Sequence, residues 1–259
     1  MAFDGQGRSC RPPSGQNQSD VGKSMITPAE ELKEIAGHVK RLLTANADMG
    51  LDPPRLTVAE SKSPEPGPDS ADTLEALRDF IGDCRRCKLW RGRTHLVFGE
   101  GNPRARLVFV GEGPGRDEDM EGRPFVGEAG KLLTRIIENG MGLKRGDVYI
   151  CNVVKCRPPK NRVPEEDEVE ACLPFLKRQL EIIGPEAICA LGLTAARSLL
   201  GRPFVMNRER GNWVSFMGVP MMPTYHPAYL LRNLSAKRHV WEDVQKIMKL
   251  MGLEVKSHD

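Results

Sequence analysis

The chain has 259 residues, of which 39% are hydrophobic, 28% charged and 5% aromatic. This length accommodates one large domain or two small ones with a sizeable core. No apolar run approaches the length of a membrane span, and the N-terminus lacks the apolar stretch of a signal peptide. We therefore expect a cytoplasmic protein without a membrane partner, whose seven cysteines serve a purpose other than disulfides.

The net charge of +3 is distributed unevenly. Residues 1–73 hold 8 basic and 11 acidic residues together with 8 of the 20 prolines, so the rest of the chain is basic. Such a segment buries too little apolar surface to offset its chain entropy. We predict a mostly disordered acidic extension over residues 1–72, an ordered domain over 73–251 and a tail over 252–259.

One helix is expected inside the extension. Residues 27–30 (TPAE) have the form of a capping box with proline at the first helical position, and apolar residues follow at helical spacing. The pattern predicts an amphipathic helix near 28–45, which offers a surface to an unknown protein partner. Five prolines between Asp52 and Asp72 then indicate an extended linker.

From Thr73 onward, strand-like runs alternate with helical patterns. The strand-like runs cover 107–110, 148–150, 187–191, 213–216 and 219–224, and the helical patterns cover 132–137, 164–183, 194–200 and 236–251. This alternation predicts a three-layer α/β/α fold with a central, mostly parallel four-stranded sheet. Ligands bind such sheets beyond the carboxyl ends of the strands, so we expect the chemistry in those loops.

Four cysteines have a spacing that suits a metal centre. Cys84 and Cys87 form a CxxC turn, and Cys156 and Cys172 follow after 68 and a further 15 intervening residues. Four thiolates in this arrangement can bind zinc or an iron-sulfur cluster. On spacing alone, unrelated thiols are an equally good interpretation.

Basic residues gather around the same cysteines. They are Arg85, Arg86, Lys88, Arg91, Arg93, Lys155, Arg157, Lys160 and Arg162. A charge run of this kind is as often a solvated face as a binding surface. Its position beside the cysteines favours a rim that binds a polyanion, because phosphate contacts supply most of the nonspecific affinity of proteins for nucleic acids.

The loop after the first long strand combines glycines with acids. Residues 111–119 read GEGPGRDED, and residues 122–127 read GRPFVG. Three glycines within five residues allow a close backbone approach to a ligand, but the loop matches neither a Walker sequence nor a dinucleotide fingerprint. Its acids favour water positioning or cation stabilisation over phosphate binding. Phe125 can stack on a planar ligand, although a lone phenylalanine is more often a core residue.

Two polar residues follow later strands. The amide of Asn152 can pair with a base edge or satisfy a turn. His226 opens the segment HPAYLLRN at 226–233, and a histidine there can stabilise an anionic leaving group, although a lone histidine is more often structural. Leu231 and Arg232 in the same segment can wedge into a base stack.

Taken together, these segments resemble the family 4 uracil-DNA glycosylases, the iron-sulfur branch of the uracil-DNA glycosylase superfamily. The resemblance spans about 74–250 and rests on CRRC (84–87), GEGPGRDED, GRPFVG, CNVVKCRPP (151–159), ACLPFL (171–176) and HPAYLLRN, in this order and spacing. It implies a monomeric, monofunctional enzyme that flips uracil out of single- or double-stranded DNA and hydrolyses its N-glycosidic bond. The product is an abasic site for base excision repair.

The resemblance implies a 4Fe-4S cluster held by Cys84, Cys87, Cys156 and Cys172. A structural role is expected for the cluster, because breaking an N-glycosidic bond is not a redox reaction. Two alternatives stay open at this point. The chain can be a noncatalytic iron-sulfur or zinc module that binds nucleic acid, such as a polymerase accessory, or it can be an electron-transfer protein.

The resemblance also assigns the residues that hold the base. Phe125 is expected to stack on the flipped uracil, while the amide of Asn152 pairs with its O4/N3 edge and rejects cytosine. Backbone amides around Gly111, Glu112 and Gly113 are expected to close over the base.

Two side chains are expected to act on the bond that breaks. Cleavage builds negative charge on uracil and positive charge on the sugar, so His226 would donate to uracil O2 and Glu118 would stabilise the sugar and position water. In the best-known branch of the superfamily an Asp occupies the place of Gly113. The acid must therefore come from elsewhere, and Glu112 competes with Glu118 for that role.

Overall fold

The computed structural model describes residues 27–48 and 67–255, in two units that divide the chain at Lys62 and Ser63. Most of the proline-rich linker and the last four residues of the tail lie outside the described residues. No helix in the two described ranges is both long and apolar enough to cross a membrane.

The described part of the N-terminal unit is helix α1 (Pro28–Asp48). The backbone N–H and the hydroxyl of Thr27 both donate to the Glu30 carboxylate at 2.8 Å, which is the capping arrangement expected from the sequence. The predicted helix is confirmed and extends slightly beyond its expected end. Its apolar side chains are exposed to solvent, among them Leu32, Ile35, Val39 and Leu42.

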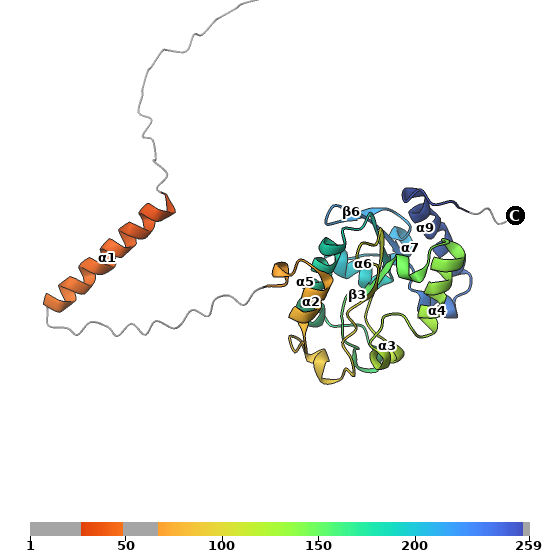
Figure 1. The fold of residues 1–259 in the computed structure, drawn as a ribbon, viewed down its shortest axis with the longest axis horizontal. Coiled ribbons are helices and arrows are strands. Elements are labelled where there is room, and N and C mark those ends of the chain that lie inside the picture. Colours follow the sequence, from red (N-terminus) through yellow and green to blue (C-terminus); the bar gives the residue numbers. More distant parts are fainter. Residues whose placement is uncertain (1–26, 49–66, 256–259) are drawn as a thin grey trace, which may run out of the picture. The chain divides into compact units, whose positions relative to one another are not determined.

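A six-stranded mixed sheet forms the centre of the C-terminal unit (Figure 1), with the order β1-β3-β2-β4-β6-β5. The strands are β1 (Glu100–Gly101), β2 (Leu107–Gly111), β3 (Tyr149–Asn152), β4 (Ala187–Leu191), β5 (Val214–Phe216) and β6 (Val219–Thr224). The predicted fold class is confirmed. The expected count of four strands holds only for the parallel centre, because the short antiparallel strands β1 and β5 extend it at both edges.

Helices cover both faces of the sheet. One face is packed by α2 (Leu74–Ile81), α5 (Glu166–Ile183) and α6 (Leu193–Leu200), and the other by α4 (Glu128–Arg135), α8 (Pro227–Arg232) and α9 (Ala236–Leu250). Short helices α3 (Arg116–Glu121) and α7 (Met206–Glu209) lie in loops, as do helical turns at Pro68–Ser70, Lys88–Arg91, Arg145–Asp147 and Pro159–Asn161. The π-helical segment Ile136–Gly140 directly continues α4.

Strand β2 shows why two layers of helices are needed. Its side chains alternate, so that Val108 and Val110 join the core under α2 and α5, while Leu107 and Phe109 join the core under α4 and α9. All four are buried. A strand that is apolar on both sides is stable only between two helical layers.

The pairing register brings the carboxyl ends of the parallel strands to one edge of the sheet. Gly111 pairs with Asn152, and Leu191 pairs with Thr224. The chain then leaves β2 toward helix α4 on one face and leaves the neighbouring β4 toward α6 on the other face. A crevice opens at such a point in a doubly wound sheet.

Gly130 allows α4 to lie directly against the loop that precedes it. A β-carbon at this position would lie 1.9 Å from the carbonyl oxygen of Phe125. We expect Gly130→Ala to destabilise the protein by about 1–3 kcal/mol, because the backbone must move to admit the methyl group. Thermal denaturation should give a lower Tm for this variant. The matched control is Gly146→Ala, whose β-carbon would meet nothing within 4 Å; equal Tm values for the two variants would contradict this packing.

Candidate functional site

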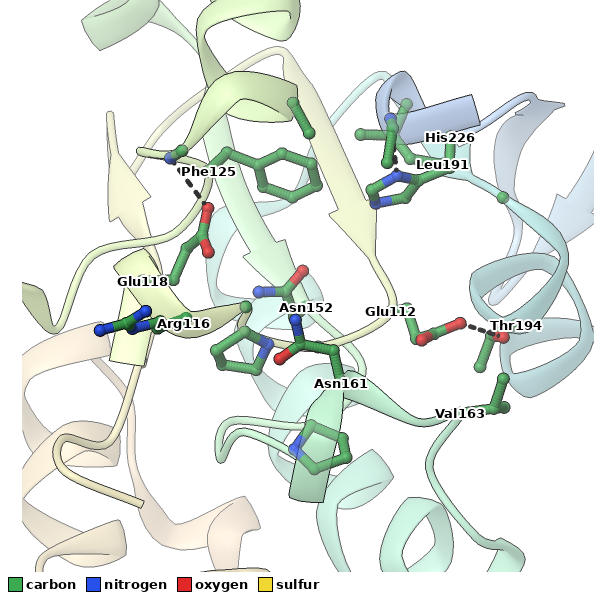
Figure 2. A pocket seen from close by; sticks show the side chains of 18 of the residues that line it. Glu112, Arg116, Glu118, Phe125, Asn152, Asn161, Val163, Leu191, Thr194 and His226 are labelled. Carbon is green, nitrogen blue, oxygen red and sulfur yellow. Dashed lines mark hydrogen bonds between the residues drawn. The ribbon is translucent and has the colours of Figure 1, made fainter. Parts of the chain in front are cut away.

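A pocket of about 660 Å³ lies at the carboxyl edge of the sheet (Figure 2). Each parallel strand contributes to it: Glu112 follows β2, Asn152 ends β3, Thr194 follows β4 and His226 follows β6. The pocket is lined by most of the residues predicted from the sequence, namely Glu112, Gly113, Glu118, Phe125, Asn152, His226 and Arg232. Strands far apart in the sequence thus deliver these side chains to one place.

The side-chain amide of Asn152 is the most unusual polar group in the pocket. Asn152 is 1% exposed, and its Oδ1 has no hydrogen-bond partner within the described residues. Leaving a buried acceptor unpaired costs about 1–3 kcal/mol. A carboxamide offers a donor and an acceptor side by side, so its natural partner is a planar ligand that presents a carbonyl next to an N–H.

Gly111 lies beside Asn152 in the sheet and leaves room for it. A β-carbon at Gly111 would lie 2.4 Å from Oδ1 of Asn152 and 2.6 Å from Cζ of Phe125. A β-carbon at Gly113 would lie 2.7 Å from Cγ2 of Val154. These glycines therefore serve the site through their missing side chains. That their amides close over a base stays a prediction.

Phe125 is held in a strained conformation against His226. The two rings stack at 5.5 Å between centroids and 29° between planes, and Figure 2 shows them side by side. The φ angle of Phe125 is 53°, in the left-handed region that a bulky residue seldom adopts. Glu118 stabilises this loop, because its Oε1 accepts the backbone N–H groups of Val126 and Gly127, both at 3.1 Å.

The two acids that compete for the catalytic role each use one carboxylate oxygen internally. Glu118 uses Oε1 for the Phe125 loop, and Glu112 uses Oε2 to accept the hydroxyl of Thr194. The other oxygen of each accepts no hydrogen bond from the residues that the structure describes. Asp119 of the same acidic run is instead buried and accepts the backbone N–H of Thr94 at 2.8 Å. The acidic run is therefore divided between the pocket and the scaffold.

His226 caps helix α8 with its own ring. Its Nδ1 accepts the backbone N–H of Ala228 at 3.1 Å, so the proton of the neutral ring is on Nε2. Burial lowers the pKa of His226 to about 4. The imidazole is therefore neutral near pH 7 and has a donor, Nε2–H, that makes no hydrogen bond within the described residues.

The four predicted metal ligands are neighbours, and none of them lines the pocket. Burial raises the pKa values of Cys87, Cys156 and Cys172, and nearby thiols of the same group raise each further: Cys84 acts on Cys87 and Cys156, while Cys87 and Cys156 act on Cys172. Such mutual effects require sulfur atoms that lie close together. No three His, Cys, Asp or Glu side chains within residues 27–48 and 67–255 converge on a single metal ion.

Hydrogen-bond donors point at these sulfur atoms. Nη1 of Arg93 lies 3.2 Å from Sγ of Cys156, and the backbone N–H of Lys155 lies 3.3 Å from Sγ of Cys172. Donors of this kind stabilise thiolates, the form of cysteine that binds metal. The donor set therefore fits a metal-bound group of cysteines.

Lys155 joins the cysteine group to the pocket. It is 1% exposed, and its Nζ donates to the carbonyl oxygen of Asn152 at 2.8 Å and to the side-chain oxygen of Gln179. Burial lowers the pKa of this lysine. The expectation that Lys155 belongs to a polyanion-binding rim is wrong, because its long side chain lies inside the protein.

Several other members of the expected rim are also engaged internally. Lys88 pairs with Glu165 and Asp167, and Arg162 pairs with Glu168. Two arginines that line the pocket, Arg116 and Arg232, make no ion pair or hydrogen bond with any described residue. The pocket wall therefore holds positive charge that no described carboxylate neutralises.

The pocket residues that sequence reasoning did not assign to the site include Arg116, Asn161 and Thr194. Thr194 comes soon after the strand-like run at 187–191, so its position was the available signal. Asn161 lies in a turn where its Oδ1 accepts Nε of Arg157 at 2.8 Å, and no local pattern indicates that. Leu231, which was predicted to contact DNA, does not line the pocket and is 44% exposed.

By fold and site, the chain is an α/β protein with a polar pocket at the carboxyl edge of its parallel strands. The family profile of the "Uracil DNA glycosylase superfamily" matches residues 98–245. The chain belongs to this superfamily, on its type-4 branch.

Similar proteins from several organisms agree with that assignment. The chain is 48% identical to the Type-4 uracil-DNA glycosylase of Sulfurisphaera tokodaii, over 69% of this chain and 85% of the relative. It is 49% identical to the Type-4 uracil-DNA glycosylase of Thermotoga maritima, over 71% and 97%. A Type-5 uracil-DNA glycosylase of Pyrobaculum aerophilum is 31% identical, over 68% and 84%.

The neutral state of His226 should be visible in the pH dependence of stability. Its pKa in the folded protein is about 4, compared with 6.5 for an ordinary histidine. Between these values the unfolded chain binds the extra proton, so the free energy of unfolding should fall as the pH decreases through this window. His226→Asn keeps an acceptor for the Ala228 N–H and removes the titration. Denaturant unfolding at several pH values should give a shallower slope for the variant, and an identical slope would show that His226 is not the group responsible.

Proposed function

We propose that the protein removes uracil from DNA by hydrolysing the N-glycosidic bond and leaves an abasic site for base excision repair. The observation that carries this proposal is the buried, unpartnered amide of Asn152 beside the Phe125 ring. The relatives named as uracil-DNA glycosylases support the same activity.

Recognition of uracil follows from the two faces of the pocket. Oδ1 of Asn152 accepts N3–H of uracil while Nδ2 donates to O4, and Phe125 stacks on the ring. Cytosine lacks the N3 proton and carries an amino group at C4, so both hydrogen bonds would be lost. The base reaches this site only after it leaves the helical stack.

Cleavage is assisted at both ends of the scissile bond. The C1′–N1 bond breaks with its electron pair going to uracil, and Nε2–H of His226 donates to O2 of the developing anion. The free oxygen of Glu118 faces the opposite charge at C1′ and orients the water whose oxygen bonds to that carbon. With no lysine proposed as a nucleophile, the reaction is a hydrolysis that leaves the strand intact.

The DNA around the flipped nucleotide is held by the mouth of the pocket. Arg116, Lys160 and Arg232 supply unpaired positive charge for the phosphates. Leu231, exposed on α8, fills the space that uracil leaves in the stack. The protein acts as a monomer in the cytoplasm, on single- and double-stranded DNA, and α1 carries the apolar face for a partner protein.

A 4Fe-4S cluster held by Cys84, Cys87, Cys156 and Cys172 completes the proposed enzyme. The hydrogen-bond donors at Cys156 and Cys172 would stabilise the thiolates that such a cluster needs. When bound, the cluster supplies cross-links between the CxxC turn, the loop after β3 and helix α5. This is a structural role, since hydrolysis transfers no electrons.

Uracil excision is tested directly with oligonucleotides that contain one uracil. We expect strand cleavage after alkali treatment of single- and double-stranded substrates, and none without alkali. His226→Ala and Asn152→Ala should each slow excision about 10²–10³-fold, because each removes a group that acts on the leaving base. Asn139→Ala, an exposed asparagine outside the pocket, is the matched control. DNA binding without excision by the native protein would favour a noncatalytic binding module instead.

The cluster is tested on the purified holoprotein without reference to activity. We expect about four iron and four sulfide per chain and broad visible absorbance, since thiolate-to-iron charge transfer gives the colour. Cys156→Ser should lose iron and lower the Tm, whereas Cys10→Ser, outside the proposed ligand set, should keep both. One zinc per chain and no visible absorbance would overturn the proposal.

A further inference from the structure

A second hollow of about 370 Å³ adjoins the uracil pocket. The two hollows share three residues of their walls, Gly192, Leu193 and His226. The rest of the second hollow is formed by α7, the end of β6 and α8, through Met206, Asn207, Tyr225 and Tyr229. A ligand group in the second hollow would therefore lie next to a base in the first.

The second hollow is lined by an anchored pair of tyrosines. The rings of Tyr225 and Tyr229 stack at 4.9 Å between centroids and 28° between planes. The hydroxyl of Tyr225 donates to Oδ1 of Asn207 at 2.9 Å, and the guanidinium of Arg210 lies 5.3 Å from its ring centroid. Arg210 is itself paired with the buried carboxylate of Asp243 at 2.7 Å. These contacts fix the ring of Tyr225, which in turn holds the ring of Tyr229 by stacking on it.

Tyr229 presents this stack to solvent. It is 45% exposed, and its hydroxyl makes no hydrogen bond with any described residue. Within the described residues, the ring of Tyr229 stacks only on that of Tyr225. Leu193, 37% exposed, adds apolar surface between the hollows. Rigid exposed aromatic rings in a groove are the means by which proteins bind the bases of single-stranded nucleic acids.

We propose that Tyr229 is a stacking site for the base adjacent to the flipped uracil in the same strand. This inference rests on the proposed function, because uracil in the first pocket places its neighbour at the shared wall. The base is unpaired in single-stranded DNA and is free to stack on the tyrosine. In duplex DNA it must first leave its own partner, so the site favours single-stranded substrates.

The test uses single-stranded oligonucleotides with a non-hydrolysable 2′-fluoro-deoxyuridine, so that binding is measured without excision. 2-Aminopurine replaces the base on either the 5′ or the 3′ side of the uracil. Its fluorescence should be quenched on binding at one of the two positions, because the base stacks on Tyr229. An abasic nucleotide at that position should weaken binding to the native protein on the order of tenfold.

Three variants locate the effect. Tyr229→Ala should abolish the quenching and bind normal and abasic oligonucleotides equally, whereas Tyr229→Phe keeps the ring and should behave as the native protein does. Leu234→Ala is the matched control, since Leu234 is 66% exposed just after α8 and lines neither hollow. Circular dichroism establishes that each variant is folded.

Two outcomes overturn the proposal. One is binding by the native protein that is unchanged by abasic nucleotides on both sides, a result that needs no variant. The other is quenching that persists in folded Tyr229→Ala. Either result combined with normal uracil excision would leave the proposed function standing and remove only the stacking site. Absence of excision would instead count against the function itself.

Discussion

The side chain of Asn152 is the constraint around which the rest of the site is arranged. Burying a carboxamide with no partner is unfavourable, and the fold accepts this at the end of its second parallel strand. Gly111 must lack a side chain to admit the amide, and Lys155 fixes the backbone carbonyl of the same residue. A ligand that forms hydrogen bonds with this amide would remove the unfavourable free energy of the unpaired acceptor.

The rings of Phe125 and His226, which line the pocket, are likewise held in place by their surroundings. Phe125 has a left-handed backbone, which Glu118 stabilises through two amide hydrogen bonds. His226 is buried enough to stay neutral, and its Nδ1 is committed to the cap of α8. Both groups therefore have a fixed orientation in the pocket, so the proposed reaction would need little reorganisation of them.

Much of the pocket could be predicted from the sequence, because its residues follow the ends of strands. Apolar runs place the strands, parallel strands share a carboxyl edge, and so Asn152 and His226 could be assigned to one pocket. Interactions between loops were not accessible. Nothing local indicates that Glu118 reaches two amides beyond the next turn, or that Tyr225 and Tyr229 stack across the end of a helix. Lys155 misleads because a lysine in a basic run is normally solvated.

Lys155 links the cysteine group to the pocket. Its backbone N–H faces Cys172, its neighbour in the chain is Cys156, and its side chain holds Asn152 and Gln179. Gln179 in turn donates to the carbonyl of Phe98. These buried hydrogen bonds act as a unit, because a buried donor that loses its partner bears the full desolvation cost. Loosening the cysteine loop would therefore disturb the backbone at Asn152, so the proposed cluster would support the pocket as well as the fold.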